Sequence, residues 1–350
     1  MIGDAVFEQS VTALGPLDLA SAALSTPLFS FVAAVLIAPL VIVAAKIIED
    51  RRRPAPVIHP EPDTATERYR PERLALSIGA ALVIFAFVIE TVVRGYLMNL
   101  ANIVEWWEYA TPVFAAVICV TAVLALIVTR GSAPPEQPAP SARRTWTSFG
   151  PRAGLIASGA TFLALLATTV AAGLESSTGS DGRYIYLELT APNTSIDPVR
   201  PWFYGWAYGV PVLVCLTALA GILWATLHTN AVRPFQRPEY VQGERVVRTE
   251  IASGVVRVAT AGMLLALAGA WRFIAEAGLM TRLINGETGE EYQTTWRYAE
   301  FAATGALLAP ILEILAFVLL ILVATRMLRT RRPRAGHEEA ELDAIAGVAR

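Results

Sequence analysis

The stretch FAATGALLAPILEILAFVLLILVAT, residues 301–325, decides the fold class. Glu313 is its single charged side chain, and a helix needs only about 20 apolar residues to cross the hydrocarbon core of a bilayer. The whole chain has the same character, because 55% of its residues are hydrophobic and 17% are charged. Such a composition lies outside the range of ordinary soluble domains. The sequence therefore predicts a membrane protein.

Six further apolar runs are long enough to cross a bilayer. The seven predicted spans are residues 28–47, 74–98, 110–129, 153–174, 207–227, 251–280 and 300–325. They predict an all-α polytopic membrane protein with about seven transmembrane helices. An extracytoplasmic segment is expected at 1–27, the bundle at 28–325 with an outer loop at 175–205, and a cytoplasmic tail at 326–350. Within the outer loop, RYIYLELT (183–190) alternates like a strand and could cap the bundle.

The positions of the basic residues predict the orientation. Of the 28 Lys and Arg residues, 21 follow spans one, three, five and seven. Because short cytoplasmic loops are enriched in Lys and Arg, the N-terminus is predicted outside and the C-terminus in the cytoplasm. Few lysines, many arginines and many alanines suggest a bacterial protein, and hence the inner (plasma) membrane.

A Trp-x-Tyr pattern recurs before spans three, five and seven. Its members are Trp107 and Tyr109, Trp206 and Tyr208, and Trp296 and Tyr298. One interpretation is an internal repeat, in which one leading helix precedes three helical hairpins arranged around a pseudo-symmetric centre. The alternative is the aromatic belt found at any membrane interface. Either way, these six residues are candidate outer anchors. This aromatic face or the C-terminal tail could also bind a membrane protein partner.

Charged residues inside the predicted spans are the candidate functional residues. Glu313 is expected near the bilayer midplane, where a carboxylate must be protonated, paired or in contact with water. Arg257 and Arg272 of span six could each reach towards it. Two i, i+4 pairs, Glu90 with Arg94 and Arg272 with Glu276, each occupy one helix face. The alternative to a functional role is that these charges only form structural ion pairs.

No motif identifies a reaction, so whether the protein is an enzyme stays open, with a non-enzyme favoured. Cys119 and Cys215 lie in apolar runs, so they are expected to be core residues and no metal or cofactor site is predicted. The lipid bilayer is an expected partner and nucleic acid is not, since topology explains the loop arginines. Three hypotheses for function remain: transport of a small solute or ion coupled through the intramembrane charges, a non-catalytic scaffold, sensor or accessory subunit, and a membrane enzyme acting on lipid or quinone.

Overall fold

The computed structural model describes residues 27–52, 67–97, 105–131, 144–189, 200–235, 241–280, 282–284, 291–293 and 296–325. Within these ranges, seven helices are long and apolar enough to cross a membrane. They are α2 (Pro27–Arg52), α4 (Arg70–Ile89), α5 (Thr111–Gly131), α6 (Arg152–Glu175), α7 (Trp206–Val232), α8 (Val241–Gly278) and α9 (Ala299–Ala324). They match the seven predicted spans and confirm the class of a multi-pass helical membrane protein. The predictions for residues 1–26 and for the tail 326–350 lie outside the described residues.

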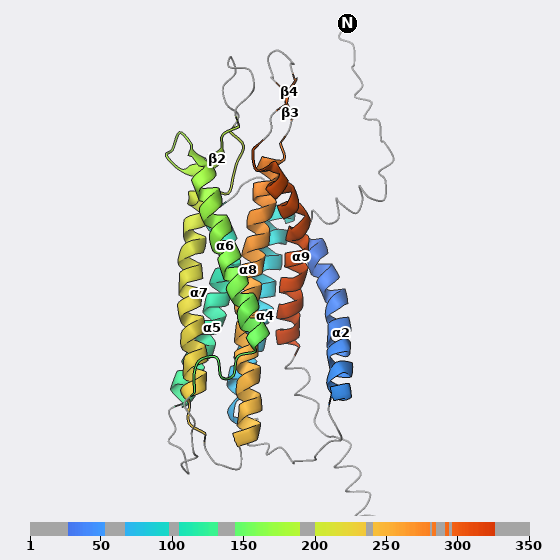
Figure 1. The fold of residues 1–350 in the computed structure, drawn as a ribbon, viewed down its shortest axis with the longest axis vertical. Coiled ribbons are helices and arrows are strands. Elements are labelled where there is room, and N and C mark those ends of the chain that lie inside the picture. The colour runs from blue at the N-terminus through green and yellow to red at the C-terminus, as the bar shows by residue number, and fades with distance from the viewer. Residues whose placement is uncertain are drawn as a thin grey trace, which may run out of the picture.

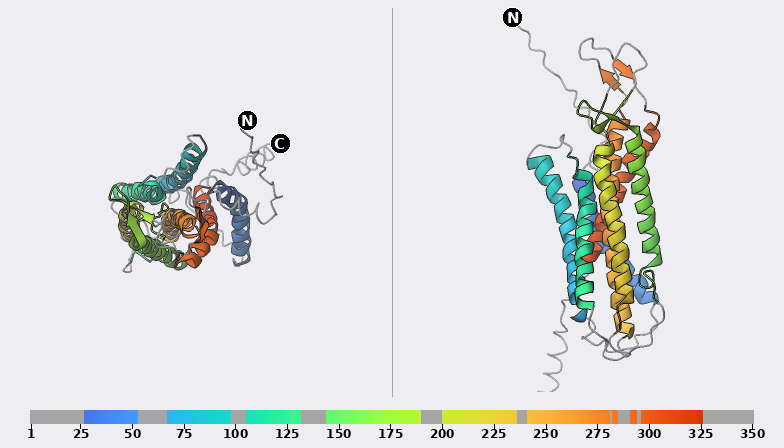
Figure 2. Two further views of the ribbon diagram at one scale, coloured as in Figure 1. Left: turned by 90° about the horizontal axis from the view of Figure 1, so that it is seen from above. Right: turned by 90° about the vertical axis from the view of Figure 1, so that its left-hand side faces the viewer.

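Helix α8 forms the centre of the bundle (Figure 2). It packs against α4, α5, α6, α7 and α9, whereas α2 packs mainly on the outside of α9. In its most apolar stretch 94% of the residues are buried, compared with 44% or less in each of the other six helices. The predicted hairpins therefore do not surround a shared central axis, because α8 itself occupies that position.

Small residues explain why α8 can be surrounded. Helices in a membrane associate closely where Gly, Ala, Ser and Thr lie at their interfaces, and in α8 such residues point in several directions. A side chain added at Gly254 would press on Leu76 of α4, and one at Gly262 would press on Pro112 and Ala116 of α5. Different faces of one helix thus receive different neighbours.

The outer helices carry the large apolar side chains on their outward faces. Examples are Leu36 of α2, Leu82 of α4, Val214 of α7 and Leu307 of α9, which are 58–74% exposed. Exposed apolar surface of this extent marks an interaction surface, and lipid is the partner that an outward face on every peripheral helix fits.

The two ends of the bundle differ in chemistry. The end that carries Trp107, Trp206 and Trp296 is here named the aromatic end, and it lies at the top of Figure 1. The opposite end carries Arg68, Arg233 and Arg248 and is named the arginine end. Helices α4, α6 and α8 run towards the aromatic end, and α5, α7 and α9 run back.

Short elements complete the aromatic end. They are a π-helix η1 (Glu90–Leu97), a 3-10 turn η2 (Glu108–Ala110), the antiparallel pair β1 (Ser176–Thr178) and β2 (Tyr184–Leu187), and the antiparallel pair β3 (Arg282–Ile284) and β4 (Glu291–Gln293). The strand predicted in RYIYLELT is thus present as β2. Its Ile185 and Leu187 are buried against α6 and α8, so this part of the loop caps the bundle as predicted. The fold is helical with two small sheets rather than wholly α.

The α4–α5 interface depends on one close approach. A methyl group at Gly79 of α4 would overlap Cys119 of α5, and overpacking of this kind costs about 1–3 kcal/mol. We expect Gly79→Ala to lower the unfolding midpoint in detergent and Cys119→Ala to restore it in the double variant. Gly221→Ala is the matched control, because a side chain at Gly221 meets nothing within 4 Å. An equal loss in both alanine variants would contradict the packing account.

Candidate functional site

A well-formed cavity lies at the aromatic end between α6 and α9. Helix α6 crosses the bundle obliquely, close to α7 at the aromatic end and away from α9 there (Figure 1). The ring of helices around α8 runs from α9 through α4, α5 and α7 to α6, and its two ends, α6 and α9, hardly touch. A cavity of about 560 Å³ fills this opening. This volume is within the range of small-molecule sites, roughly 300–1,000 Å³.

The cavity, named here the α6/α9 cleft, is built from small walls and an aromatic floor. Ala167 and Ala171 of α6 face Gly305 of α9 across it, and Trp271 of α8 lies at its base. The Trp271 indole N–H donates a 3.0 Å hydrogen bond to the Thr168 hydroxyl, which fixes the ring across the floor. Thr168 belongs to a run of small residues spaced four apart along α6. Because their side chains are short, they leave room for the cleft.

Aromatic and charged groups form the polar rim of the α6/α9 cleft. Tyr298 and Trp296 lie edge to face, with ring centroids 5.4 Å apart, and both line the cavity. Glu175, at the end of α6, forms an ion pair with Arg297. The hydrogen bond and charge of Glu175 raise the pKa of the exposed Arg297 guanidinium. The cleft is therefore apolar inside, with a paired charge at its upper edge.

The predicted aromatic anchors divide into two groups. Tyr109 and Tyr208 come together, with ring centroids 5.9 Å apart, and both pack against Phe273 of α8. Tyr204, which the sequence did not single out, completes this cluster 5.3 Å from Tyr109. Burial raises the pKa of the Tyr204 phenol well above its usual value. These tyrosines hold helices together, whereas Tyr298 faces the cleft.

The three tryptophans that were predicted to be anchors lie at, or just before, the start of a helix. Trp206 is the first residue of α7 and its ring covers Gly173 near the end of α6. Trp296 covers Gly278, the last residue of α8, in the same way. Trp107 precedes η2 and is 39% exposed. Two of the three therefore pack on a glycine at the end of the preceding helix.

Glu313 is paired inside the bundle. Arg272 Nε lies 2.6 Å from Glu313 Oε1, and Arg272 Nη2 lies 2.8 Å from Oε2, a bidentate geometry. The Glu313 side chain is 3% exposed and that of Arg272 is 17% exposed. Of the three states expected for Glu313 (protonated, paired or in contact with water), the structure shows the paired one, and the partner is Arg272.

Side-chain direction explains how this pair forms. Trp271 and Gly305 lie opposite each other in α8 and α9, so Arg272 and Glu313 start about two turns apart along the bundle. Side chains in a helix tilt towards its N-terminus. Because α8 and α9 are antiparallel, Arg272 leans towards the arginine end, Glu313 leans towards the aromatic end, and the two meet.

The other predicted charges lie elsewhere. Glu276 is exposed one turn beyond Arg272, and Arg257 is half-buried much nearer the arginine end of α8. Glu90 is half-buried where α4 changes into η1, and its N–H bonds to the carbonyls of both Ala86 and Phe87. The side chain of Arg94 lies outside the described residues. Its pairing with Glu90 therefore stays a prediction.

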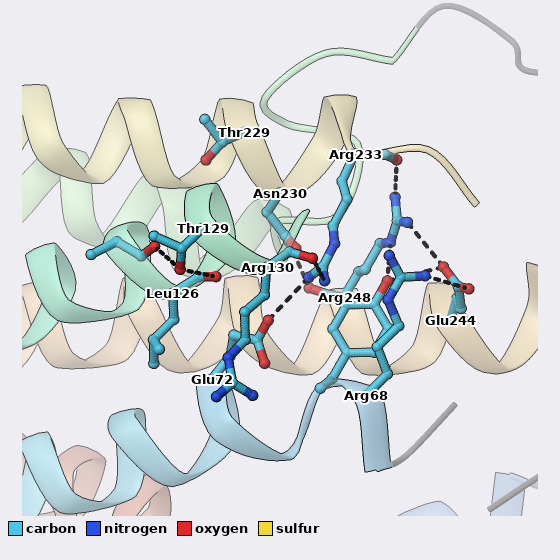
Figure 3. A network of polar contacts seen from close by, with 12 residues as sticks. Arg68, Glu72, Leu126, Thr129, Arg130, Thr229, Asn230, Arg233, Glu244 and Arg248 are labelled. Atoms are coloured by element: carbon cyan, nitrogen blue, oxygen red, sulfur yellow. Dashed lines mark hydrogen bonds and ion pairs between the residues drawn. The ribbon is translucent and has the colours of Figure 1, made fainter. Parts of the chain in front are cut away.

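A buried polar network at the arginine end was not predicted (Figure 3). Arg248 of α8 is fully buried, and its Nε donates to the Tyr69 hydroxyl at 3.0 Å. Arg248 Nη2 and the Tyr69 hydroxyl both donate to Glu244 Oε2 at 2.9 Å. Burial raises the pKa of the Tyr69 phenol, which keeps its proton available for this bond. Arg68 lies 3.6 Å from the other oxygen of Glu244.

The same network caps helix ends. Arg248 donates to the carbonyl of Arg233 at 2.6 Å and to that of Pro234 at 2.9 Å, just beyond α7. Arg233 in turn pairs with Glu72 of α4 at 3.1 Å and donates to the carbonyl of Arg130, near the end of α5. Helix ends expose unpaired carbonyls, and cations there are favourable. The network thus ties α4, α5, α7 and α8 together (Figure 3).

A usable signal for this network existed in the sequence. Arg248 follows Glu244 by four residues and Ile251 follows Val247 by four, and this spacing predicts that the helix extends N-terminal to the apolar run. Helix α8 indeed begins at Val241, ten residues before the predicted span. The enrichment of arginine in cytoplasmic loops already accounts for every arginine of this loop. The sequence therefore gives no separate reason to expect that one of them is buried.

Comparison with known proteins finds no matching family model, no matching curated protein and no matching solved structure. The class that the fold defines is a multi-pass membrane protein built from seven apolar helices, with a lateral apolar cleft at one end and a buried charge network at the other.

Proposed function

We propose that the protein binds an amphipathic molecule of the membrane, of the lipid or isoprenoid class, in the α6/α9 cleft. The observation that carries this proposal is a cavity of about 560 Å³ that lies at the side of the bundle, between two helices that otherwise face lipid. Its interior is mainly apolar, and its one charged lining residue, Glu175, lies at the rim beside Arg297. A ligand with an apolar body and one polar end matches this division.

The intramembrane charges give less support to coupled transport. Glu313 and Arg272 satisfy each other in a bidentate pair, and neither lines the α6/α9 cleft. Glu90 and Glu276 do not line it either. A membrane enzyme acting on lipid or quinone would need a reactive group at the ligand. Binding, carriage or sensing of the ligand fits the cleft better than catalysis.

The setting of this site is part of the proposal. We place the protein in a bacterial inner membrane with the aromatic end outside, because the basic residues gather at the other end. We also retain one leading helix, α2, followed by three hairpins. The matching contacts of Trp206 with Gly173 and of Trp296 with Gly278 support that repeat.

Filling the cleft tests the proposal. Ala171 is exposed inside the cleft, so Ala171→Phe places a ring where the ligand body would lie. We expect this variant to retain at least about tenfold less ligand than the unmodified protein. This corresponds to a loss of about 1.4 kcal/mol in binding free energy. The readout is mass spectrometry of small molecules that co-purify with the protein from its native membrane.

Ala122→Phe is the matched control. Ala122 is also exposed on a helix, but it lies on α5 and lines neither the α6/α9 cleft nor the groove described below. It should retain the same ligand as the unmodified protein. Equal retention in the two variants, or no retained lipid or isoprenoid in the unmodified protein, would overturn the proposed function.

A further inference from the structure

A second groove lies on the other side of α6. It has a volume of about 230 Å³ and runs between α6 and α7 towards the arginine end, with Met263 of α8 at its base. The oblique path of α6 opens the bundle towards α7 at this end, as it opens towards α9 at the other (Figure 1). The groove shares no lining residue with the α6/α9 cleft. The two sites are therefore independent.

We propose that this α6/α7 groove binds an acyl chain of an anionic glycerophospholipid, with Arg152 and His228 at its phosphate. The body of the groove suits an acyl chain, because Leu155, Phe162 and Leu219 line it along the helices. A side chain at Gly159 would meet nothing within 4 Å, so the wall of α6 is recessed there.

The mouth of the groove carries groups that suit a lipid headgroup. Trp146 and Trp224 line it and are 41% and 55% exposed, which is the usual position of tryptophan at a membrane interface. The His228 ring stacks on Trp224 at 5.4 Å between centroids, one turn closer to the arginine end. Both indole and imidazole rings can donate hydrogen bonds to phosphate or ester oxygens.

Arg152 supplies the positive charge. It is exposed on the first turn of α6, three residues before Leu155 and seven before Gly159, so it shares their helix face. The structure records no carboxylate paired with Arg152 among the described residues. The arginine end is also the end predicted to face the cytoplasmic leaflet, which carries the anionic lipids.

Ser158 supplies a hydrogen bond between headgroup and chain. It lines the groove two turns from Arg152 and is 6% exposed, and no hydrogen bond from its hydroxyl to any described residue is recorded. A glycerophospholipid places its ester carbonyls between phosphate and acyl chain, in the same order as Arg152, Ser158 and Phe162 follow along α6.

Lipid retention on the intact protein tests this assignment. The purified chain is mixed with dioleoyl phosphatidylglycerol or dioleoyl phosphatidylcholine in detergent and examined by native mass spectrometry. We expect phosphatidylglycerol to be retained about fivefold better, the effect of one arginine beside an anionic headgroup. Arg152→Gln should remove that preference. Arg245→Gln, at an exposed arginine of α8 that does not line the groove, should keep it.

A second pair of variants tests the groove itself. Gly159→Leu fills the groove and should abolish retention of both lipids, whereas Gly221→Leu is its control on α7. A side chain at either glycine meets nothing within 4 Å, but only Gly159 lines the groove. Equal retention by these two variants, equal retention of the two lipids by the unmodified protein, or an unchanged preference in Arg152→Gln would overturn the assignment.

Discussion

Arg248→Met is expected to lower the free energy of unfolding by about 3–5 kcal/mol, because it breaks a buried ion pair. Glu244, which is 2% exposed, would keep only the Tyr69 hydroxyl and the more distant Arg68, and the carbonyls of Arg233 and Pro234 would lose their donor. Methionine keeps much of the side-chain volume, so the loss is one of charge and hydrogen bonds. The measurement is SDS-induced unfolding in mixed micelles, followed by circular dichroism.

Arg245→Met is the control on the same helix. Arg245 is exposed, and surface substitutions of this kind change stability by about 0.5 kcal/mol or less. The loss of stability in Tyr69→Phe should lie between those of Arg248→Met and Arg245→Met, because this variant removes one hydroxyl that both donates and accepts a hydrogen bond in the network. If Arg248→Met were as stable as the control, the network would not hold the arginine end together.

Glu313→Leu is expected to destabilise the bundle by a similar amount, about 3–5 kcal/mol. The substitution leaves the Arg272 guanidinium inside the apolar region without the two carboxylate bonds at 2.6 and 2.8 Å. Glu313→Gln should cost less, because the amide oxygen still accepts a hydrogen bond. The same SDS unfolding measurement applies.

The double variant distinguishes a structural pair from two independent residues. Buried ion pairs replaced on both sides by apolar groups are often neutral in stability, so Glu313→Leu with Arg272→Met should return to within about 1 kcal/mol of the unmodified protein. Additive losses in the double variant would show that the two side chains do not depend on each other.

Hydropathy predicted the helices but not their arrangement. The seven spans follow from apolar runs, since lipid imposes a minimum length on each crossing. The sequence left open whether Glu313 is protonated, paired or in contact with water. It did indicate Arg257 and Arg272 as the cations within reach, because neighbouring spans of a hairpin lie side by side. The choice of Arg272 over Arg257 depends on side-chain tilt and helix stagger, which spacing alone does not give.

The α6/α9 cleft and the arginine network could not be predicted from the sequence, for two different reasons. The α6/α9 cleft results from the oblique path of α6, and no residue pattern encodes a helix tilt directly. Tyr69 and Glu72, at the start of α4, meet Arg233, which follows α7 and is more than 150 residues away in the chain. In the sequence, each of these three residues reads as an ordinary residue at the end of a span. Only their convergence shows that buried ion pairs hold this end of the bundle together.

The central position of α8 has a consequence for the order of assembly. Chains are made from the N-terminus, so α2, α4, α5, α6 and α7 are complete before the helix that they enclose exists. α8 is also the least apolar of the seven spans, with a mean hydropathy of 1.8, and the carboxylate that pairs with its Arg272, Glu313, belongs to α9, which is synthesised last. The earlier helices therefore have to admit the sixth span after they have entered the membrane. Without α8 and α9 the ring of helices is open between α4 and α6, and this is the side from which a newly made hairpin of α8 and α9 can complete the bundle.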